Sequence, residues 1–447
     1  MTRFRWSGKQ PLIILLGYIV ILLFSNLGLI DVFQKAQMES NEIGASSVKQ
    51  VQFWAISSED NHSDLLIKQI VSDFNAQNDS IHVNLVINSD KYFHKINSTS
   101  IATQTNPDIS VMFNSQAIQF GDRGFLFSPT NLTYDIENNG FDFIPNVISQ
   151  EMLYKQYVGI PLSVENYILL VRMDTLEKYG VKIPENLNEL LGALRTITSR
   201  DMVGIALPNE GYLSYRTLLY FILVNGGMLY RDDGSIQLSS DKNIEVYEFL
   251  NTLSREGLIN NYKPQQSITD VTNQFIKGEA AAVLTTPEMI KYIYEKTSKD
   301  FVKNMEILSL RSFDDTFYSS GPIFTQVLCV YKNSARKPEA QIFAEWLCRE
   351  YSNRWPQNND SAIPALTTGY NGTYISGEFN EKIFEEILLN STYPTYPNPL
   401  STNEIILEGT DVLNGFMQGL LTPDSDFSSL IPEYQNEINI LAEKFNR

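Results

Sequence analysis

Apolar and polar residues alternate with two different periods in the part of the chain before residue 115. Strand-like apolar runs lie at residues 51–56, 81–87 and 108–113. Between them, residues 64–74 place apolar side chains on one helical stripe, and a second helical pattern follows at about residues 92–102. Strands and helices that alternate in this way predict βαβ units and a mainly parallel sheet.

Helical patterns dominate after residue 170. They cover residues 174–179, 187–198, 215–224, 241–255, 271–277 and 338–351, with strand-like runs at 280–284 and 326–331 and further helices from about residue 378. Ser239 lies in the N-cap region of the helix at 241–255. A chain of 447 residues is too long for one ordinary core, so the pattern predicts an α/β protein with two or three lobes.

Three candidate binding residues follow from this pattern, because ligands of parallel sheets bind beyond the carboxyl ends of the strands. Trp54 and Glu59 belong to the end of the first strand and the loop after it, and Asn114 directly follows the third strand. Each also has a purely structural interpretation. Trp54 could pack in the core, Glu59 could sit in a solvated turn, and Asn114 could form a turn.

The N-terminal region predicts a membrane segment. Residues 11–30 are uncharged and rich in Leu and Ile, and at about 1.5 Å per residue they would span one bilayer core of about 30 Å. Arg3, Arg5 and Lys9 precede the segment, so the N-terminus should stay inside and the rest should be exported. We favour an uncleaved anchor over a cleaved signal peptide, because the run is long and no Ala-x-Ala site follows it. Residues 31–49 are polar and read as a spacer.

Composition limits the classes of function. Apolar residues make up 43% and charged residues 19% of the chain, which is typical of a globular protein. The net charge of −18 argues against a nucleic acid partner, since phosphate binding needs a basic face. The same charge suits a neutral or cationic ligand, although it can serve solubility alone.

Catalytic and cofactor motifs are missing from the sequence. There is no GxxxxGK[ST], GxGxxG or GxSxG motif. The three histidines, His62, His82 and His94, form no HExxH pattern, so we expect no metal and no other cofactor. The acidic pair of Glu59 and Asp60 is typical of a solvated turn rather than of acid–base catalysis.

Two cysteines are present. Cys329 and Cys348 each lie in an apolar run, which predicts buried, unreactive thiols. A disulfide between them stays possible outside the cytoplasm.

A set of segments in a fixed order resembles a known family. The segments are FWAISSE (53–59), NPDISVMF (106–113), GDRGFLFSP (121–129), the block from YVGIP to LGAL (157–194), NGG (225–227), FIKGEAAAVLTTP (275–287), SSGP (319–322) and AIPA (362–365). Together they resemble the bacterial extracellular solute-binding protein family 1, the maltose- and other sugar-binding components of ABC importers. The resemblance covers nearly all of the chain after residue 50. The chain departs from the family in three places. It lacks the lipid-attachment cysteine, and it has Thr286-Pro287-Glu288 where many members read Gly-Pro-Trp. It also has Leu187 where the family has a tryptophan at a helix start.

The resemblance implies a two-lobed, periplasmic-binding-protein-like α/β fold with crossing hinge strands, preceded by the N-terminal hydrophobic helix. The expected divisions are residues 1–47 for the anchor and spacer, 48–161 with 322–355 for the first lobe, and 162–321 with 356–447 for the second lobe. It implies a monomeric, non-enzymatic binding component outside the cytoplasm. That component would capture a carbohydrate, in particular an oligosaccharide, by hinge closure and pass it to ABC permease subunits.

The resemblance also implies further ligand contacts. Glu165 lies where the family places an acidic or polar contact, with an interlobe salt bridge as the alternative. Tyr212, Tyr215 and Arg216 flank a helix start in the second lobe, and we expect at least one of them to face the cleft. The remaining candidates are Ser320, beside Gly321 in the return segment, and Trp355, near the third crossing, which could equally belong to the core.

Other functions compete with sugar import. The lobes could present a ligand to a membrane sensor and transport nothing, or they could bind a peptide or a polyamine, which the net charge mildly favours. An exported glycosidase is a third possibility, and it would need two carboxylates about 5–10 Å apart across the cleft.

Overall fold

The computed structural model describes most of the chain after residue 47. The described residues are 48–57, 62–89, 99–129, 141–148, 152–153, 156–259, 265–358, 363–368, 388, 390–395, 403–423 and 425–445. Within them, residues 50–447 belong to one compact unit. The predicted membrane segment at residues 11–30 and the candidate Glu59 lie outside the described residues. Among the helices described, none combines the length and hydropathy needed to cross a membrane.

The first sheet is mixed rather than mainly parallel. Its strands run in the order β13-β7-β12-β3-β1-β2, with β4 also paired to β12. Their bounds are β1 Lys49–Ser57, β2 Ile81–Ser89, β3 Ile109–Phe113, β4 Leu126–Phe127, β7 Ile160–Asn166, β12 Ile323–Tyr331 and β13 Ile363–Pro364. β1 and β3 are parallel, but β12 is antiparallel to both of its neighbours in the order, β3 and β7. The prediction of a mainly parallel sheet was therefore wrong, because the returning strand β12 inserts between β3 and β7.

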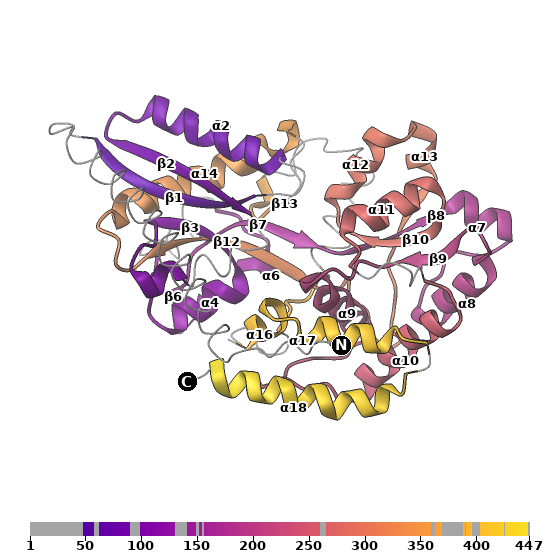
Figure 1. Ribbon diagram of the computed structural model, residues 1–447. Helices are drawn as coiled ribbons and strands as arrows, with labels where there is room; N and C mark the ends of the chain where they lie inside the picture. Colours follow the sequence, from indigo (N-terminus) through magenta and orange to yellow (C-terminus); the bar gives the residue numbers. More distant parts are fainter. Residues whose placement is uncertain are drawn as a thin grey trace, which may run out of the picture. The chain divides into compact units, whose positions relative to one another are not determined.

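Helices cover both faces of this sheet, because its strands alternate apolar side chains between the two sides. α2 (His62–Gln77) and α14 (Lys337–Asn358) pack together over one face, where the Phe343 ring lies 5.1 Å from the rings of Phe53 and Phe74. α4 (Asn114–Asp122) covers the other face, onto which β12 directs Val327 and Cys329. Figure 1 shows α2 and α4 on opposite sides of the strands.

The second sheet has the order β11-β8-β10-β9. Its strands are β8 Ile168–Arg172, β9 Val203–Ala206, β10 Ala280–Thr285 and β11 Met305–Leu308. The helices that follow these strands are α7 Met173–Tyr179, α8 Leu187–Ile197, α9 Tyr212–Val224, α10 Asp241–Arg255, α11 Ile268–Lys277, α12 Glu288–Lys296 and α13 Lys299–Lys303. The remaining short elements are α6 Pro145–Ile148, β5 Met152–Leu153 and β6 Gln156–Tyr157.

The C-terminal helices belong with the second sheet. α16 (Glu404–Gly409) and α17 (Val412–Leu420) pack on α9, and α18 (Phe427–Phe445) packs on both of them. Figure 1 shows α16 and α17 beside α9, although about 180 residues separate α9 from α16 in sequence. Their apolar side chains share one core with those of β8, α9 and α10.

Local signals explain where the helices begin and end. The Ser240 side chain caps α10 by accepting from the backbone N–H of Asn243, one residue beyond the predicted Ser239. Ser267 and Asp270 form a capping box at the start of α11, and Gly278 ends that helix with a φ of 73°. α9 begins at Tyr212, three residues before the predicted start, so Tyr212 and Arg216 lie one turn apart on the same helix.

The structure shows no disulfide between Cys329 and Cys348, and both cysteines are buried. Cys348 Sγ lies 3.2 Å from the Pro161 carbonyl oxygen, and burial raises the pKa of this thiol to about 12. The prediction of buried, unreactive thiols agrees with this environment.

Candidate functional site

Polar side chains meet where the two long strands β7 and β12 pair. Phe324 lies opposite Glu165 and Gln326 lies opposite Ser163 in the antiparallel register, so these four side chains share one face. Gln326 Nε2 donates to Glu165 Oε1 at 3.0 Å, and Ser163 Oγ donates to Gln326 Oε1 at 3.2 Å. The pairing fixes the Glu165 carboxylate on the strands that run from the first sheet toward the second.

Arg216 reaches this carboxylate from α9. Its Nη1 lies 2.5 Å from Glu165 Oε2, and its Nη2 lies 2.8 Å from Glu408 Oε1 on α16. Glu408 Oε2 in turn accepts from Ser115 Oγ at 2.6 Å. We call Ser115, Ser163, Glu165, Arg216, Gln326 and Glu408 the Arg216 network.

Aromatic rings enclose the guanidinium. Arg216 Cζ lies 4.1 Å from the ring centroid of Phe324, 4.7 Å from that of Tyr212 and 5.1 Å from that of Phe113. A cation within about 6 Å of a ring face is attracted by the ring quadrupole, more strongly when water is excluded. The Arg216 side chain is only 1% exposed, so rings and carboxylates surround its guanidinium in place of water, while its Nε has no hydrogen-bond partner among the described residues.

Electrostatics keep this buried arginine charged. Burial alone would lower the pKa of the Arg216 guanidinium, but the nearby Glu165 and Glu408 carboxylates outweigh it and raise that pKa well above its usual value. Glu408 is also buried, with a side chain only 3% exposed, whereas the Glu165 side chain is 20% exposed. Glu165 is therefore the carboxylate of this network that solvent or a ligand can reach.

A second acidic residue of α16 lies one turn before Glu408. Glu404 is buried, and the Tyr215 hydroxyl lies 3.4 Å from its Oε1 and 3.2 Å from the Tyr230 hydroxyl. Burial is the largest cause that raises the pKa of Tyr215 well above its usual value, and the neighbouring Tyr230 and Glu404 raise it further. Tyr215 is therefore a neutral hydrogen-bonding side chain between α9 and α16.

The structure brings some of the predicted site residues together and separates others. Arg216 contacts both Glu165 and Tyr212. Asn114 directly follows β3 as predicted and is buried, and its Oδ1 has no hydrogen-bond partner within the part of the chain that the structure describes. Trp54 is half-buried and Trp355 is 3% exposed, and both pack with the core around the first sheet.

Ser320 lies in a separate place, where three chain segments cross. Its Oγ contacts the Tyr318 hydroxyl at 3.2 Å, and its backbone N–H donates to Asn390. The Asn166 amide, at the end of β7, donates to the Pro322 carbonyl and to Ser391 Oγ. Gly321 has a φ of 87° there, and a Cβ at this position would lie 2.5 Å from the Tyr220 ring, so this crossing point requires glycine.

Several residues of the site were not predicted from the sequence. They are Phe113, Ser115, Ser163, Phe324, Gln326 and Glu408. A signal existed for some of them, because Ser163 and Gln326 are polar residues within largely apolar strands. Glu408 likewise ends an apolar helix one turn after Glu404, a spacing that places both carboxylates on one face.

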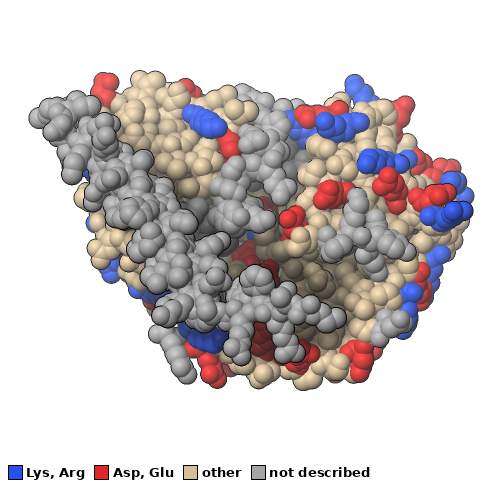
Figure 2. Space-filling model, in the orientation of Figure 1, with Lys and Arg blue, Asp and Glu red and all other residues tan. Residues whose placement is uncertain are grey.

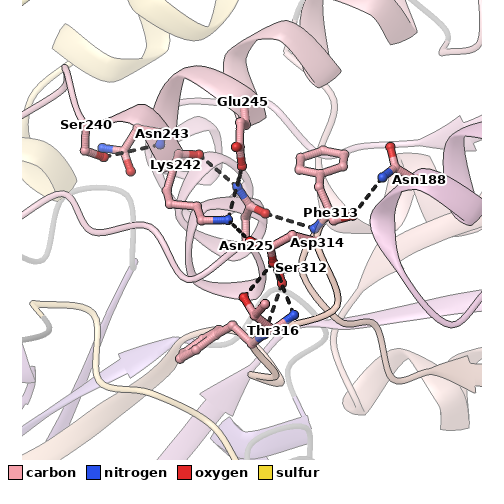
Figure 3. Close-up of polar contacts among 11 residues, drawn as sticks. Asn188, Asn225, Ser240, Lys242, Asn243, Glu245, Ser312, Phe313, Asp314 and Thr316 are labelled. Atoms are coloured by element: carbon pink, nitrogen blue, oxygen red, sulfur yellow. Dashed lines mark hydrogen bonds and ion pairs between the residues drawn. The ribbon is translucent and has the colours of Figure 1, made fainter.

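A second polar network fixes the loop that leads from β11 to β12. The Asp314 carboxylate accepts from Ser312 Oγ and from the backbone N–H and Oγ1 of Thr316, and it pairs with Lys242 Nζ at 2.8 Å (Figure 3). Two further bonds join Asn225 and Asn188 to the backbone of Phe313. This loop is therefore held on α8, α9 and α10 just before the chain crosses to the first sheet.

Asp314 makes the loop sensitive to acid. Lys242, then Ser312 and Thr316, hold the pKa of the Asp314 carboxyl below its usual range. A depressed folded-state pKa stabilises the folded loop above the unfolded-state value of about 3.9, and that contribution is lost as pH falls through the folded value. Asp314→Asn should thus speed amide exchange at Thr316 and Phe317 at pH 7, with an effect that shrinks as pH falls below about 3.9 toward the folded-state value, measured by hydrogen exchange. Protection that is equal in both proteins at pH 7 would contradict this role, and Asp233→Asn, a change in another exposed turn, is the control.

Charge on the visible surface shows no basic patch. Among the described residues on the face in Figure 2, Lys and Arg side chains are scattered between acidic and neutral ones. Nucleic acid binding uses a gathered basic face, and this face does not offer one.

A comparison with protein families identifies the family to which the chain belongs. The family model described as bacterial extracellular solute-binding protein matches residues 60–350, which is more than half of the chain. The chain belongs to this family. As a solute-binding protein it is not an enzyme, as the sequence predicts. A search of curated proteins finds no match.

Solved structures share the fold of this solute-binding protein. A sugar transporter from Arthrobacter chlorophenolicus A6 with bound laminaribiose is 22% identical, with a TM-score of 0.77 over 87% of this chain and 98% of that one. The sugar-binding protein MalE of Xanthomonas citri is 18% identical, with a TM-score of 0.73 over 89% and 98%. Maltose-bound MalE3 of T. maritima is 16% identical, with a TM-score of 0.73 over 88% and 100%. These likenesses confirm the predicted α/β solute-binding fold.

Proposed function

We propose that this solute-binding protein captures a carbohydrate outside the cytoplasm and delivers it to the permease subunits of an ABC importer. The observation that carries the proposal is the Glu165 carboxylate, which is 20% exposed and held between Gln326 and Arg216, whose guanidinium in turn lies over the rings of Tyr212 and Phe113. Sugars need this combination, because carboxylates and amides bond their hydroxyls while aromatic faces cover their C–H surfaces. Family membership and the sugars bound in similar structures support the same ligand class.

The residues of the proposed ligand site come from the first sheet and the residues after its strands, from α9 and α14, and from the chain crossing at Ser320. They are Trp54, Glu59, Asn114, Glu165, Tyr212 and Ser320, together with Tyr215, Arg216 and Trp355, whose buried side chains would support the site from behind. Glu165 has the central role, because each of its oxygens accepts one protein donor and keeps a lone pair for a sugar hydroxyl. Arg216 orients that carboxylate and compensates its charge.

The lobes are proposed as residues 48–161 with 322–355 and residues 162–321 with 356–447, with β7 and β12 as the crossing strands. Because β7 pairs with β12 in the first sheet as far as Asn166, the side chains of β7, including Glu165, are proposed to move with the first lobe. Ligand binding would favour their closure, because a ligand that contacts both lobes binds the closed form better. The protein is proposed to act as a monomer that is tethered to the membrane by residues 11–30.

A thermal-shift screen of the full-length protein tests the ligand class. We expect oligosaccharides to raise the unfolding temperature, because a ligand at 100 times its Kd adds about 2.7 kcal/mol of stability. Peptides and polyamines serve as the competing panels. Stabilisation by either panel, with none by any sugar, would reject the carbohydrate proposal.

A further inference from the structure

The Arg216 network joins elements that pack on different sheets. Arg216 and Glu408 lie on α9 and α16, whose apolar residues share the core of the second sheet. Glu165 is a residue of β7 in the first sheet, and Ser115 belongs to α4, which packs on the first sheet. Two polar links therefore run between the two sets of elements, one from Arg216 to Glu165 and one from Glu408 to Ser115.

Each side of this contact keeps a partner for its charge if the two sets move apart. Arg216 and Glu408 are in the same set, so their ion pair can persist. Glu165 keeps the amide of Gln326, which lies beside it in the same sheet. Separation would therefore break the Arg216–Glu165 pair, the Ser115–Glu408 bond and the ring contacts of Arg216 with Phe113 and Phe324, but would leave no ion without a polar neighbour.

The broken contacts are strong ones. Charge-assisted hydrogen bonds are roughly twice as strong as neutral ones, and burial reduces the screening that weakens exposed ion pairs. The Arg216 and Glu408 side chains are only 1% and 3% exposed, so both links lie in such an environment.

We propose that the Arg216 network is a latch that holds the two lobes together before any ligand arrives. The inference rests on the two-lobed hinge of the proposed function and adds a device to it. In this arrangement Arg216 makes the contact between lobes that a ligand would otherwise have to provide. The latch increases the fraction of closed protein, and the apparent affinity for a ligand rises in proportion to that fraction.

The position of the latch fits this role. Glu165 is the residue before Asn166, whose amide bonds to Pro322 at the crossing of the strands. The network thus borders the crossing segments about which the lobes are proposed to rotate, and its links to Glu165 and Ser115 tie α9 and α16 to the first sheet there.

Distance measurements on unliganded, full-length protein test the latch. Gln69→Cys on α2 and Lys182→Cys beside α7 are exposed positions for a fluorophore pair, and both native thiols are buried. Ser115→Ala removes one link by deleting a hydroxyl, and Glu165→Gln weakens the other by removing a charge. Ser110→Ala is the matched control, because Ser110 is a buried serine that bonds to Tyr331 within the first sheet.

We expect Ser115→Ala and Glu165→Gln each to lower the ratio of closed to open protein by about tenfold, seen as a longer mean distance between the labels. Ser110→Ala should leave the wild-type distances unchanged. Distances that are the same in wild type and in both latch variants would overturn the latch. The distance measurement needs no ligand, so its outcome does not depend on the sugar screen. If the latch variants lengthen the distance but no sugar binds, the latch stands and only the proposed ligand class is rejected.

Discussion

Replacing Arg216 with methionine should lower the free energy of unfolding by about 3–5 kcal/mol. The substitution keeps much of the side-chain volume but removes the cation that compensates Glu165 and Glu408. Glu408 would then be a buried carboxylate without an opposite charge, which is far more costly than losing an exposed pair. Three aromatic rings would also lose their cation.

Equilibrium denaturation with urea measures this loss. Arg195→Met is the matched control, because Arg195 also pairs with a glutamate through two nitrogens, yet its side chain is 48% exposed. We expect the control to cost about 0–1 kcal/mol. Equal losses in the two variants would show that burial of the Arg216 network adds nothing to stability.

Replacing Glu165 with glutamine should weaken carbohydrate binding by about tenfold to a hundredfold, or roughly 1.4–2.7 kcal/mol. Glutamine keeps the shape of the side chain but loses the charge that strengthens bonds from sugar hydroxyls. Alanine should cost at least as much. The side chain is 20% exposed, so neither change should unfold the protein.

The ion pair with Arg216 gives Glu165 a second role, and the two roles make different predictions. If Glu165 acts only in the latch, Glu165→Gln should lower the affinity for the carbohydrate no more than Ser115→Ala does. Ser115→Ala opens the lobes but leaves the proposed ligand contacts in place. If Glu165 also contacts the ligand, calorimetry should show a larger loss for Glu165→Gln than for Ser115→Ala. Glu256→Gln, an exposed acid paired with Arg195, should leave affinity unchanged.

Local pattern predicted most individual elements of the fold. The helix at Asp241–Arg255 matches its predicted bounds, because its cap and its apolar stripe are both local signals. The mixed first sheet was not predictable in this way. Val327 pairs with Pro161 across about 165 residues, and no local period reveals which distant strand inserts between β7 and β3.

The candidate site was predictable only in part, for the same reason. The family resemblance predicts Glu165 and Arg216 as site residues, with an interlobe salt bridge as the alternative for Glu165, but the sequence does not show which residue would be its partner. Arg216 lies 192 residues from Glu408, and Ser115 lies 293 residues from it. Contacts over such separations depend on how the lobes pack, which side-chain periodicity does not encode.

Titration calorimetry of the full-length protein with an oligosaccharide series tests the central claim most directly. The account predicts saturable binding of one carbohydrate per chain, with a negative heat-capacity change from apolar surface buried against aromatic rings. It also predicts that the same sugar raises the unfolding temperature in the screen. Absence of binding by every sugar, together with one-to-one binding of a polyamine or a peptide, would contradict it.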